Sequence, residues 1–538
     1  METLHLALEE WRKILGTENV QTDRQSNEPF HASTIDITRQ IPAVLFAKET
    51  RQIVKIVQTA SRYGVPLYPV STGHNWGYGT ANPVVDGCVL LNLSRMNRIH
   101  EFDRDSGVVR VGPGVTQGQL RDYLDRQGEP FMVPVHGGGP DCSLIGNALE
   151  RGYGITSYAD HFSALTSLEA VLPDGEIYRS ALTDMKIAEI DGVFKWGIGP
   201  YLDGIFTQSN IGIVTQATLA LAPQPETSEA FIFSIENTVA LEAVIPVLRK
   251  LLRKLGSTIT SVNLMNTLRV LAMAVPYPSE EVPDGQTIPP SLISSLAEKL
   301  DAAAWTGVGA IQGEYEIVCA AKKIIREHLK PFSKKFVFLN RSKIGMIEHV
   351  LKWVPKRWTD TFFQRLDTIT GFLDIIEGRP NRMPLALAYW KSKFQKRDRS
   401  ASLDPARDRC GLIWYAPLVP FKPKAVRDYV AMVSRYCLEN GINPIITLTT
   451  LNDRCFDSTV PILFQRDHEQ ECINAKRCFE TLLKEGKRKG FLPYRVGIDA
   501  MHHLVDPEIP FWKLASQIKK QIDPKNIIAP GRYSVVDS

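Results

Sequence analysis

Hydrophobic and polar residues near the start of the chain follow the pattern of a strand, a helix and a second strand. The apolar run IPAVLFA begins at Ile41, and the segment KETRQIVKIVQTASRYG carries apolar residues at helical spacing as far as Gly64. A second apolar run, VPLYPV, begins at Val65. Two short apolar runs on either side of an amphipathic helix predict a crossover unit, in which the helix connects two strands.

Similar patterns continue to the end of the chain. We predict strands at CVLLNL, VVRVGPG, LTSLEAVLPDGEIY and GIVTQATLALAP, and a helix at TQGQLRDYLDRQG. The segment APQPETSE then marks a boundary, after which helical stretches such as ALEAVIPVLRKLLRKLG mix with strand-like ones such as CGLIWYAPLVP. The tail from Phe491 carries loop-like segments. We therefore expect an α+β protein with one domain over residues 1–225 and a second over residues 226–489.

Composition and charge exclude several classes of protein. The 538 residues are 44% hydrophobic and 23% charged, which is typical of a folded globular chain and not of a disordered or fibrous one. Lys and Arg number 63 and Asp and Glu 59, so the net charge is +4, and no local basic tract adds to it. This surplus is too small for a nucleic-acid-binding surface, and we expect no nucleic-acid partner.

The sequence indicates neither a membrane protein nor a metal site. The N-terminal METLHLALEEWRKILG reads as an amphipathic helix and not as a secretion signal, and no run of about 18 uncharged apolar residues is long enough to cross a membrane. The eight cysteines are scattered without a CxxC pair, unlike those of a zinc site or a disulfide framework. We predict a cytoplasmic protein without a bound metal.

Two glycine-rich segments stand out between the predicted elements: Ser71-Thr72-Gly73-His74-Asn75-Trp76-Gly77-Tyr78-Gly79 and the segment from His136 to Asn147. Unpaired backbone N–H groups in such loops can hold phosphate. Neither loop has the GxGxxG spacing of a Rossmann site or the GK[ST] ending of a P-loop, and each taken alone could equally be a simple turn. His74 and Cys142 are nucleophiles able to bond to an electrophilic cofactor ring, if such a ring lies between the loops.

Four separated segments resemble the vanillyl-alcohol oxidase and p-cresol methylhydroxylase (PCMH) family of FAD-dependent oxidoreductases: IPAVLFAKETRQIVKIVQTASRYGVPLYPVSTGHNWGYG, CSLIGNALERGYGITSYADHF, GPYLDGIFTQSNIGIVTQATLALAP and IDPKNIIAPGRYS. The resemblance implies a PCMH-type FAD-binding domain of two subdomains, built from residues 1–225 and 490–538. It also implies a cap domain over residues 226–489 that covers the flavin ring, and a homodimer.

The resemblance assigns a set of residues to flavin binding: Ser71, Thr72, Gly73, His74, Asn75, Cys142, Ser143, Gly146, Asn147, Gly212, Ile213 and Val214. Some members of the wider superfamily hold FAD through two covalent bonds, one from a His in the first loop and one from a Cys in the second. His74 and Cys142 stand at those positions, and we expect both bonds to form. Relatives of the vanillyl-alcohol type usually bond the flavin through a cap residue instead, so this sequence departs from their pattern.

Substrate binding is implied by Tyr78 and the adjacent pair Tyr494-Arg495, which match the phenolate-binding residues of the family. Hydrogen-bond donors and a guanidinium around a phenol oxygen lower the pKa of the phenol. The phenolate then pushes electrons toward the para carbon and assists the loss of a hydride there. Without the resemblance, Tyr494-Arg495 would read as an ordinary surface pair.

The acid/base residue of the vanillyl-alcohol type has no direct counterpart. An acidic residue precedes the triple glycine in those relatives, whereas Val135-His136 stands there in this sequence. His136, whose ordinary pKa is about 6.5, and Asp141 are the candidates for the role. A family tyrosine is also replaced by Ile155, which predicts a changed substrate pocket.

We therefore predict an enzyme that transfers a hydride from the benzylic carbon of a para-substituted phenol to flavin, giving a quinone methide. The substrate is a small aromatic molecule, and either dioxygen or an electron-carrier protein reoxidises the flavin. One alternative is an oxidase with doubly bonded flavin that acts on a carbohydrate or a secondary-metabolite alcohol. Another is a flavin-free ligand-binding module, although a scaffold has no use for two nucleophiles aimed at one ring.

Overall fold

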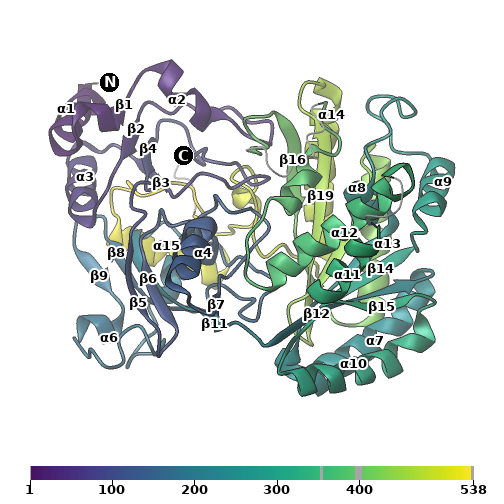
Figure 1. Ribbon diagram of the computed structural model, residues 1–538. Coiled ribbons are helices and arrows are strands. Elements are labelled where there is room, and N and C mark those ends of the chain that lie inside the picture. The colour runs from purple at the N-terminus through teal and green to yellow at the C-terminus, as the bar shows by residue number, and fades with distance from the viewer. Residues whose placement is uncertain (1, 352–355, 394–402, 535–538) are drawn as a thin grey trace.

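The computed structural model describes residues 2–351, 356–393 and 403–534. Figure 1 shows two halves: the first part of the chain lies on one side together with the C-terminal segment, and the middle of the chain lies on the other. The mixed class of helices and sheets expected from the sequence is confirmed. Within the described part, no helix is both long enough and apolar enough to cross a bilayer. The domain boundaries at residues 225 and 490 stay a prediction.

The first sheet has the strand order β1-β2-β4-β3. Its strands are β1 (Val20–Gln21), β2 (Val44–Phe46), β3 (Leu67–Val70) and β4 (Val89–Asn92). The predicted crossover is present: α3 (Thr50–Tyr63) connects β2 with β3, and both strands run parallel to β4, which lies between them. Helix α1 (Glu2–Leu15) packs on α3, where the buried Trp11 donates from Nε1 to the carbonyl of Ile56 at 3.2 Å. The short helix α2 (Arg24–His31) follows β1.

The second sheet is antiparallel, with the order β5-β6-β10-β8-β9. Its strands are β5 (Ile99–Asp103), β6 (Val108–Val111), β8 (Leu165–Val171), β9 (Ile177–Arg179) and β10 (Ile213–Ala220). The predicted helix α4 (Gln117–Gln127) is present and begins with a capping box between Thr116 and Gln119. The remaining elements of this region are α5 (Leu144–Leu149), α6 (Ala181–Asp184) and the ribbon of β7 (Phe131–Met132) with β11 (Ala222–Pro223).

The middle of the chain forms one large sheet with the order β15-β12-β14-β13-β18-β19-β16, and β17 pairs with β19. Its strands are β12 (Thr227–Ile235), β13 (Ile259–Asn266), β14 (Trp305–Gly313), β15 (Phe336–Leu339), β16 (Cys410–Tyr415), β17 (Leu418–Pro420), β18 (Thr447–Thr450) and β19 (Cys455–Gln465). Gly307 and Gly309 on β14 leave room for the rings of Phe233 and Phe231, because a Cβ at either glycine would lie within 2.2 Å of the ring.

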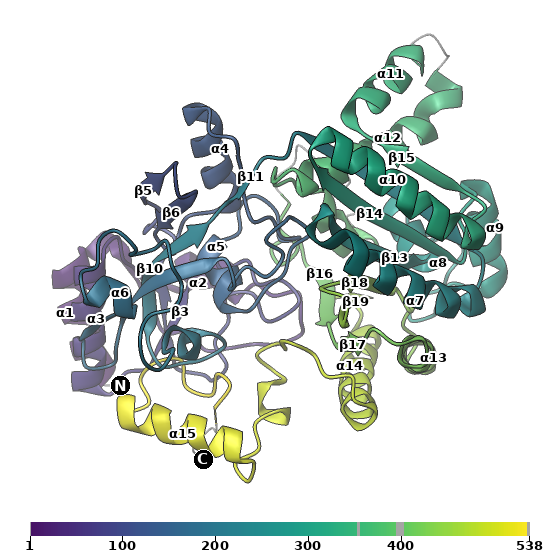
Figure 2. The same cartoon turned by 90° about the horizontal axis from the view of Figure 1, so that it is seen from below.

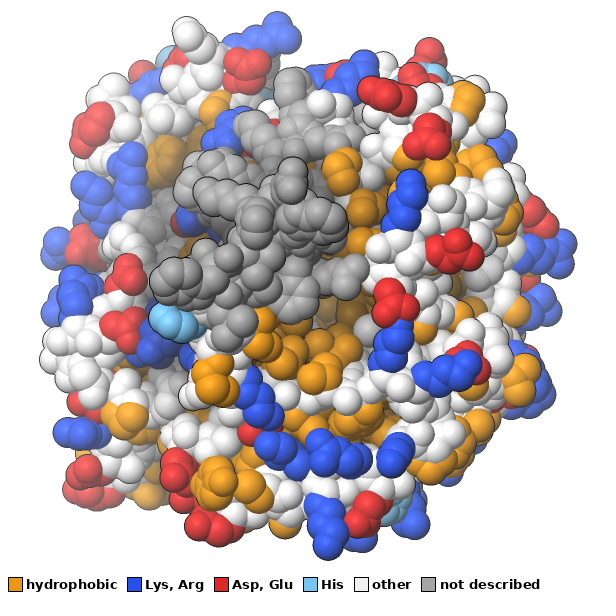
Figure 3. Space-filling view, turned by 45° about the vertical axis from the view of Figure 1, so that its right-hand side comes forward, with side chains coloured by type: hydrophobic (Ala, Val, Ile, Leu, Met, Phe, Trp, Pro, Cys, Tyr) orange, Lys and Arg blue, Asp and Glu red, His pale blue; other side chains and the backbone are white. Residues whose placement is uncertain are grey.

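Helices cover both faces of this sheet. The large core lies under four helices: α7 (Thr238–Leu255), α10 (Tyr315–Leu329), α13 (Pro423–Glu439) and α14 (Glu469–Lys489). Other helices lie over parts of the opposite face: α8 (Thr267–Ala274), α9 (Pro290–Leu300), α11 (Arg341–Leu351), α12 (Lys356–Ile376) and the 3-10 helix Met383–Tyr389. On the face drawn in Figure 3, hydrophobic side chains gather near the centre, and Lys and Arg are interspersed with Asp and Glu around them.

The C-terminal segment returns to the first sheet. Leu67 of β3 accepts from the N–H of Ala529 and donates to the carbonyl of Ile527, both at 2.7 Å. The tail also contains the helix α15 (Pro510–Ile522), beside the N-terminal half of the molecule in Figures 1 and 2, where the sequence predicted only loop-like segments. The end of the chain therefore contributes to the same core as its beginning.

A buried ion pair joins the 3-10 helix region to α14. Lys391 Nζ lies 2.9 Å from Glu471, and their side chains are only 4% and 2% exposed. The other Glu471 oxygen accepts from the N–H of Gly285 at 2.7 Å. We expect Lys391→Met to lower the free energy of unfolding by about 3–5 kcal/mol, because it leaves a buried carboxylate without its cation. Urea unfolding followed by tryptophan fluorescence measures this loss.

The double variant Lys391→Met with Glu471→Gln is the control. It removes both charges, so we expect it to unfold at a higher urea concentration than the single variant. A single variant as stable as the parent chain would contradict the structural role of this pair.

Candidate functional site

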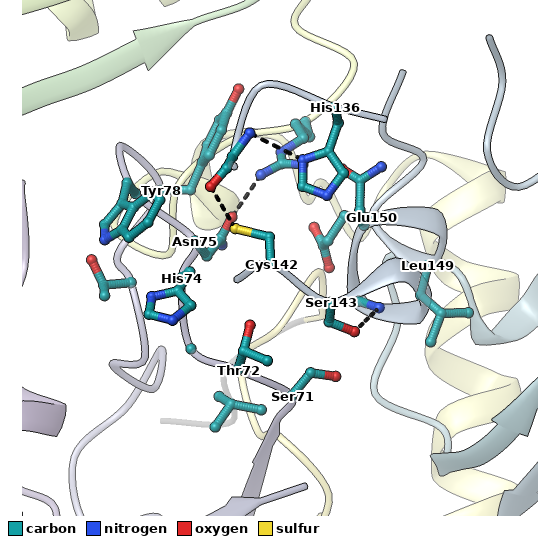
Figure 4. A pocket seen from close by; sticks show the side chains of 18 of the residues that line it. Ser71, Thr72, His74, Asn75, Tyr78, His136, Cys142, Ser143, Leu149 and Glu150 are labelled. Carbon is teal, nitrogen blue, oxygen red and sulfur yellow. Dashed lines mark hydrogen bonds between the residues drawn. The ribbon is translucent and has the colours of Figure 1, made fainter. Parts of the chain in front are cut away.

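A cavity of about 480 Å³ lies between the two glycine-rich loops and the inner face of the large sheet. This volume is within the range of small-molecule sites. The wall facing the loops comes from β16 and β19, whose residues alternate: Ile413 and Tyr415 pack into the helix-covered core, whereas Leu412 and Trp414 line the cavity. Figure 4 shows the loop side of this cavity.

The first loop follows β3 and leaves its backbone donors free. None of the backbone N–H groups of residues 72–76 donates a hydrogen bond to another described residue. Gly73 has φ +74°, a left-handed conformation that favours glycine. The loop closes at Gly77, whose N–H donates to the Thr34 hydroxyl at 2.7 Å. A row of unpaired N–H groups at a cavity wall is suited to hold an anionic group such as a pyrophosphate.

The second loop is held by one buried side chain of α4. Gln117 accepts from the N–H of His136 at 2.9 Å and donates to the carbonyl of Gly139 at 2.7 Å. Beyond the loop, the Ser143 hydroxyl caps α5 by accepting from the N–H of Gly146 at 3.0 Å, and it donates to the carbonyl of Pro113 at 2.7 Å. These contacts fix both ends of the loop against the cavity.

The structure brings the predicted flavin-contact residues to this one cavity. Its lining includes Ser71, Thr72, Gly73, His74, Asn75, Cys142, Ser143, Gly146, Asn147, Gly212, Ile213 and Val214. Of the predicted catalytic residues, Tyr78, His136, Tyr494 and Arg495 also line it. Asp141 does not; its carboxylate pairs with Arg382 at 2.7 Å, and its side chain is 53% exposed. Their roles in binding or catalysis stay predictions.

The pKa values of the two predicted attachment residues shift in opposite directions, and both groups are uncharged near neutral pH. Burial lowers the pKa of His74, with the charges of Asp404 and Asp141 acting in the opposite direction, so the imidazole is neutral near pH 7. Its ring lies 4.9 Å from the ring of Trp76. Cys142 is buried, donates from Sγ to the carbonyl of Gly138 at 2.9 Å, and has a pKa raised by burial. Figure 4 shows both side chains at the same cavity wall.

Tyr78, Tyr494 and Arg495 form a compact group at one end of the cavity. The Arg495 guanidinium carbon lies 3.9 Å from the centre of the Tyr78 ring, and Nη2 donates to Asn75 Oδ1 at 2.6 Å. Burial raises the pKa of Tyr78 to about 12, although the charge of Arg495 acts against this shift. Burial likewise raises the pKa of Tyr494. Both phenols are therefore protonated donors next to a guanidinium.

Asp457 on β19 lies in the same group, and the sequence reasoning missed it. The residue is 7% exposed, and its Oδ1 is buried without a hydrogen-bond partner. Burial raises the pKa of Asp457 to about 7, with the charge of Arg495 acting in the opposite direction. No motif marks this residue. The available signal was a charged residue inside the apolar strand CFDSTVPILF.

His136 is a neutral imidazole. Its Nδ1 accepts from the N–H of Gly138 at 3.2 Å, which leaves the proton on Nε2, and Nε2 is buried without a partner. Burial lowers the pKa of His136 to about 3, and the nearby His161 and Arg495 act in the same direction. His161 is held by Asn147, whose Nδ2 donates to its Nδ1 at 2.6 Å. His136 can therefore donate a hydrogen bond but carries no positive charge near neutral pH.

The replacement at Ile155 affects the pocket less directly than expected. Ile155 packs against two cores and does not line the cavity, whereas Tyr153 does. The Tyr153 ring meets the Tyr494 ring edge-on, with centres 5.3 Å apart. Tyr153, two positions before Ile155, therefore provides an aromatic contact to Tyr494. Among the described residues, no three His, Cys, Asp or Glu side chains are grouped as a metal site.

Comparison with known proteins connects this geometry to flavoproteins. Residues 41–181 match the family model described as FAD binding domain. The chain is 34% identical over 534 residues to 1'-carboxy-chondrochloren decarboxylase of Chondromyces crocatus, covering 99% of this chain and 97% of that protein. It is 27% identical to the flavoprotein subunit of 4-cresol dehydrogenase (hydroxylating) of Pseudomonas putida, covering 98% and 95%. The crystal structure of p-cresol methylhydroxylase with substrate bound superposes with a TM-score of 0.87 at 26% identity, covering 99% and 97%.

The titration of Asp457 gives a prediction for stability. Because its pKa is raised from 3.8 to about 7, the folded chain keeps a proton between these values that the unfolded chain has lost. This contribution therefore lowers the free energy of unfolding as the pH rises through that range. Asp457→Asn lacks this contribution. From about pH 5 to about pH 8, the free energy of unfolding of the variant should therefore rise by about 3 kcal/mol relative to that of the parent chain.

Urea unfolding at the two pH values measures this difference. The control is Asp141→Asn, which changes a half-exposed carboxylate and should shift the pH dependence far less. Equal pH dependence in the parent chain and Asp457→Asn would show that Asp457 titrates in its ordinary range.

Proposed function

From the premise that this chain belongs to the PCMH-type family of FAD-dependent oxidoreductases, we propose that it removes a hydride from the benzylic carbon of a para-substituted phenol. The observation that carries the proposal is the group of Tyr78, Tyr494, Arg495 and Asp457 at one end of the cavity. Two phenol hydroxyls and a guanidinium beside a carboxyl group with a free oxygen can bind and deprotonate a phenol.

The residues present fit a bound FAD. The unpaired N–H groups of residues 72–76 offer donors for its pyrophosphate, and the predicted contact residues surround one continuous cavity. FAD, when bound, supplies the acceptor for the hydride. Side chains of this protein take the phenol proton and hold the phenolate, and the substrate supplies the electron pair.

At the phenol end, Asp457 Oδ1 takes the phenol proton, and Arg495 with the two tyrosine hydroxyls holds the phenolate oxygen. A pKa of about 7 suits Asp457 to this exchange near neutral pH. The lone pair of the phenolate moves into the ring as the benzylic C–H bond breaks and its electron pair leaves with the hydrogen. The organic product of this two-electron oxidation is a quinone methide.

The quinone methide can react further in two ways. It can take up water at the benzylic carbon, which gives a phenolic alcohol. It can also lose CO2 when a carboxylate is on the carbon next to the benzylic position: the electron pair of the C–CO2 bond forms a carbon–carbon double bond and restores the phenolate. The similarity to a protein named as a decarboxylase over nearly the whole chain favours the second route as an alternative.

We also propose that FAD is bonded to both His74 and Cys142, that the protein forms a homodimer, and that dioxygen or an electron-carrier protein is the final acceptor. His74 is neutral and therefore nucleophilic, and both residues line the cavity.

The competing functions are oxidation of a carbohydrate or secondary-metabolite alcohol, and ligand binding without a flavin. Anaerobic mixing with 4-ethylphenol decides among them: bleaching of the flavin absorbance supports the phenol, and bleaching only with a sugar alcohol opposes it.

The phenolate site gives a prediction for catalysis. Arg495→Met or Tyr494→Phe should slow flavin reduction by about 10- to 150-fold, equivalent to about 1.5–3 kcal/mol, because a charge-assisted hydrogen bond to the phenolate is lost. Stopped-flow absorbance under anaerobic conditions measures the rate. Tyr158→Phe, at a tyrosine that is 43% exposed, is the control and should reduce at the parental rate. Unchanged rates in both site variants would remove the phenolate site from the mechanism.

Covalent attachment is tested by peptide mass mapping of acid-denatured protein. The parent chain should give flavin on peptides that contain His74 and Cys142, His74→Ala should keep the Cys142 link, and Cys142→Ala should keep the His74 link. Cys88→Ala, at a buried thiol outside the cavity, is the matched control. Free flavin released from the parent chain would contradict the double attachment.

A further inference from the structure

We propose that Arg269 binds a carboxylate at the end of the substrate opposite its phenol oxygen, so that the substrate class is a 4-hydroxyphenyl-substituted carboxylic acid. The inference rests on the proposed function for the phenol end and extends it to a second cationic side chain that lines the same cavity. Arg269 lines the cavity and comes from α8, outside all the segments that resemble the family.

The Arg269 side chain is held in place but incompletely paired. Its Nε donates to the Thr447 hydroxyl of β18 at 3.2 Å, and its backbone N–H donates to the Asn266 side chain at 3.0 Å. Its Nη1 is buried and has no hydrogen-bond partner among the described residues. A buried guanidinium nitrogen without a partner is costly, so a ligand that pairs with it gains affinity.

The charges around the cavity leave Arg269 as the unbalanced cation. Of the described residues, three arginines line the cavity. Arg532 forms an ion pair with Glu150, and Arg495 lies near Asp457. Among the described residues, no carboxylate is paired with Arg269, and no neighbouring charge shifts its pKa. Burial alone lowers the pKa of Arg269, to about 10, and the group still carries its charge near neutral pH.

Apolar side chains also line this cavity, which restricts the ligand. Leu385, Leu387, Ala388 and Leu412 line the cavity together with Arg269. An apolar molecule with one negative charge matches this environment, and the planar guanidinium matches the two oxygens of a carboxylate. A phosphate ester carries nearly two charges and would need a second free cation. The chemistry of the wall therefore favours a monocarboxylate.

The strand register places the phenol end and Arg269 on one face of the sheet. Thr447, which holds Arg269, pairs across the strands with Thr459. Thr459 and Asp457 both line the cavity and are two positions apart on β19, a spacing of about 7 Å along the strand. An aromatic ring with a short side chain can therefore reach from Arg495 and Asp457 to Arg269.

The test compares two probes that differ only in charge: 3-(4-hydroxyphenyl)propanoate and 3-(4-hydroxyphenyl)propanamide. We expect Arg269→Met to raise the half-saturating concentration of the acid for flavin reduction at least tenfold and that of the amide less than twofold. Arg269→Lys keeps the charge and should recover part of the affinity for the acid. Arg435→Met is the control, because Arg435 is exposed on α13 and pairs with Glu439, and it should change neither value.

Binding of the acid, measured by calorimetry with the FAD-loaded protein, separates this proposal from the proposed function. If the acid binds with an affinity that depends on Arg269 but neither probe reduces the flavin, the phenol-oxidation proposal fails and the carboxylate site stands. If Arg269→Met affects the acid and the amide equally, or if the parent chain binds the amide more tightly than the acid, the carboxylate site is overturned. Flavin content and melting temperature of each variant confirm that it is folded.

Discussion

This site depends on one constraint: charged and titratable side chains around a single cavity are removed from water. Asp457, Tyr494 and Arg495 are each taken out of bulk solvent, and burial is the largest influence on the pKa of each. The energetic cost of this burial is offset only in part by the mutual attraction of Asp457 and Arg495. The site is therefore held ready for a ligand that completes the pairing.

The cavity exists because three distant parts of the chain meet there. The first loop supplies Asn75, the last part of the chain supplies Arg495, and a hydrogen bond of 2.6 Å joins them. Gln208, which follows α6 in the chain, donates to the carbonyl of Tyr494 at 2.9 Å. The middle of the chain closes the cavity with β16 and β19. No single segment forms the site by itself, which explains why no short motif describes it.

Much of the local structure was predictable from the sequence, because local patterns carry it. The crossover around α3 follows from apolar spacing, and the start of α4 follows from its capping box. The insertion of β4 between β2 and β3 was not predictable, since strand order depends on contacts across the sheet. Helix α15 was missed because its sequence, PFWKLASQIKKQI, lies between segments rich in turn residues. Both loops are also evident in the sequence, because their glycines interrupt the patterns of the regular elements.

The sequence predicts only part of the site, because only some of its residues lie in segments with a recognisable local pattern. Tyr78, Tyr494 and Arg495 belong to segments with a recognisable resemblance, whereas Asp457 and Arg269 lie on elements with none. Their significance comes from burial and from missing partners, which only the folded chain defines. Asp141 shows the converse case: it is near the triple glycine in the sequence, but its side chain turns to Arg382 instead of the cavity.

The hydrogen bond between Asn75 and Arg495 joins the loop proposed to bind the cofactor to the side chain proposed to bind the substrate. Asn75 belongs to the loop with the free backbone donors, and its side-chain oxygen accepts from the guanidinium of Arg495. A ligand that orders this loop therefore also orders Arg495, and a ligand on Arg495 also orders the loop. By thermodynamic reciprocity, each must strengthen the binding of the other by the same factor. Loading with cofactor would thus act as the first step of substrate selection.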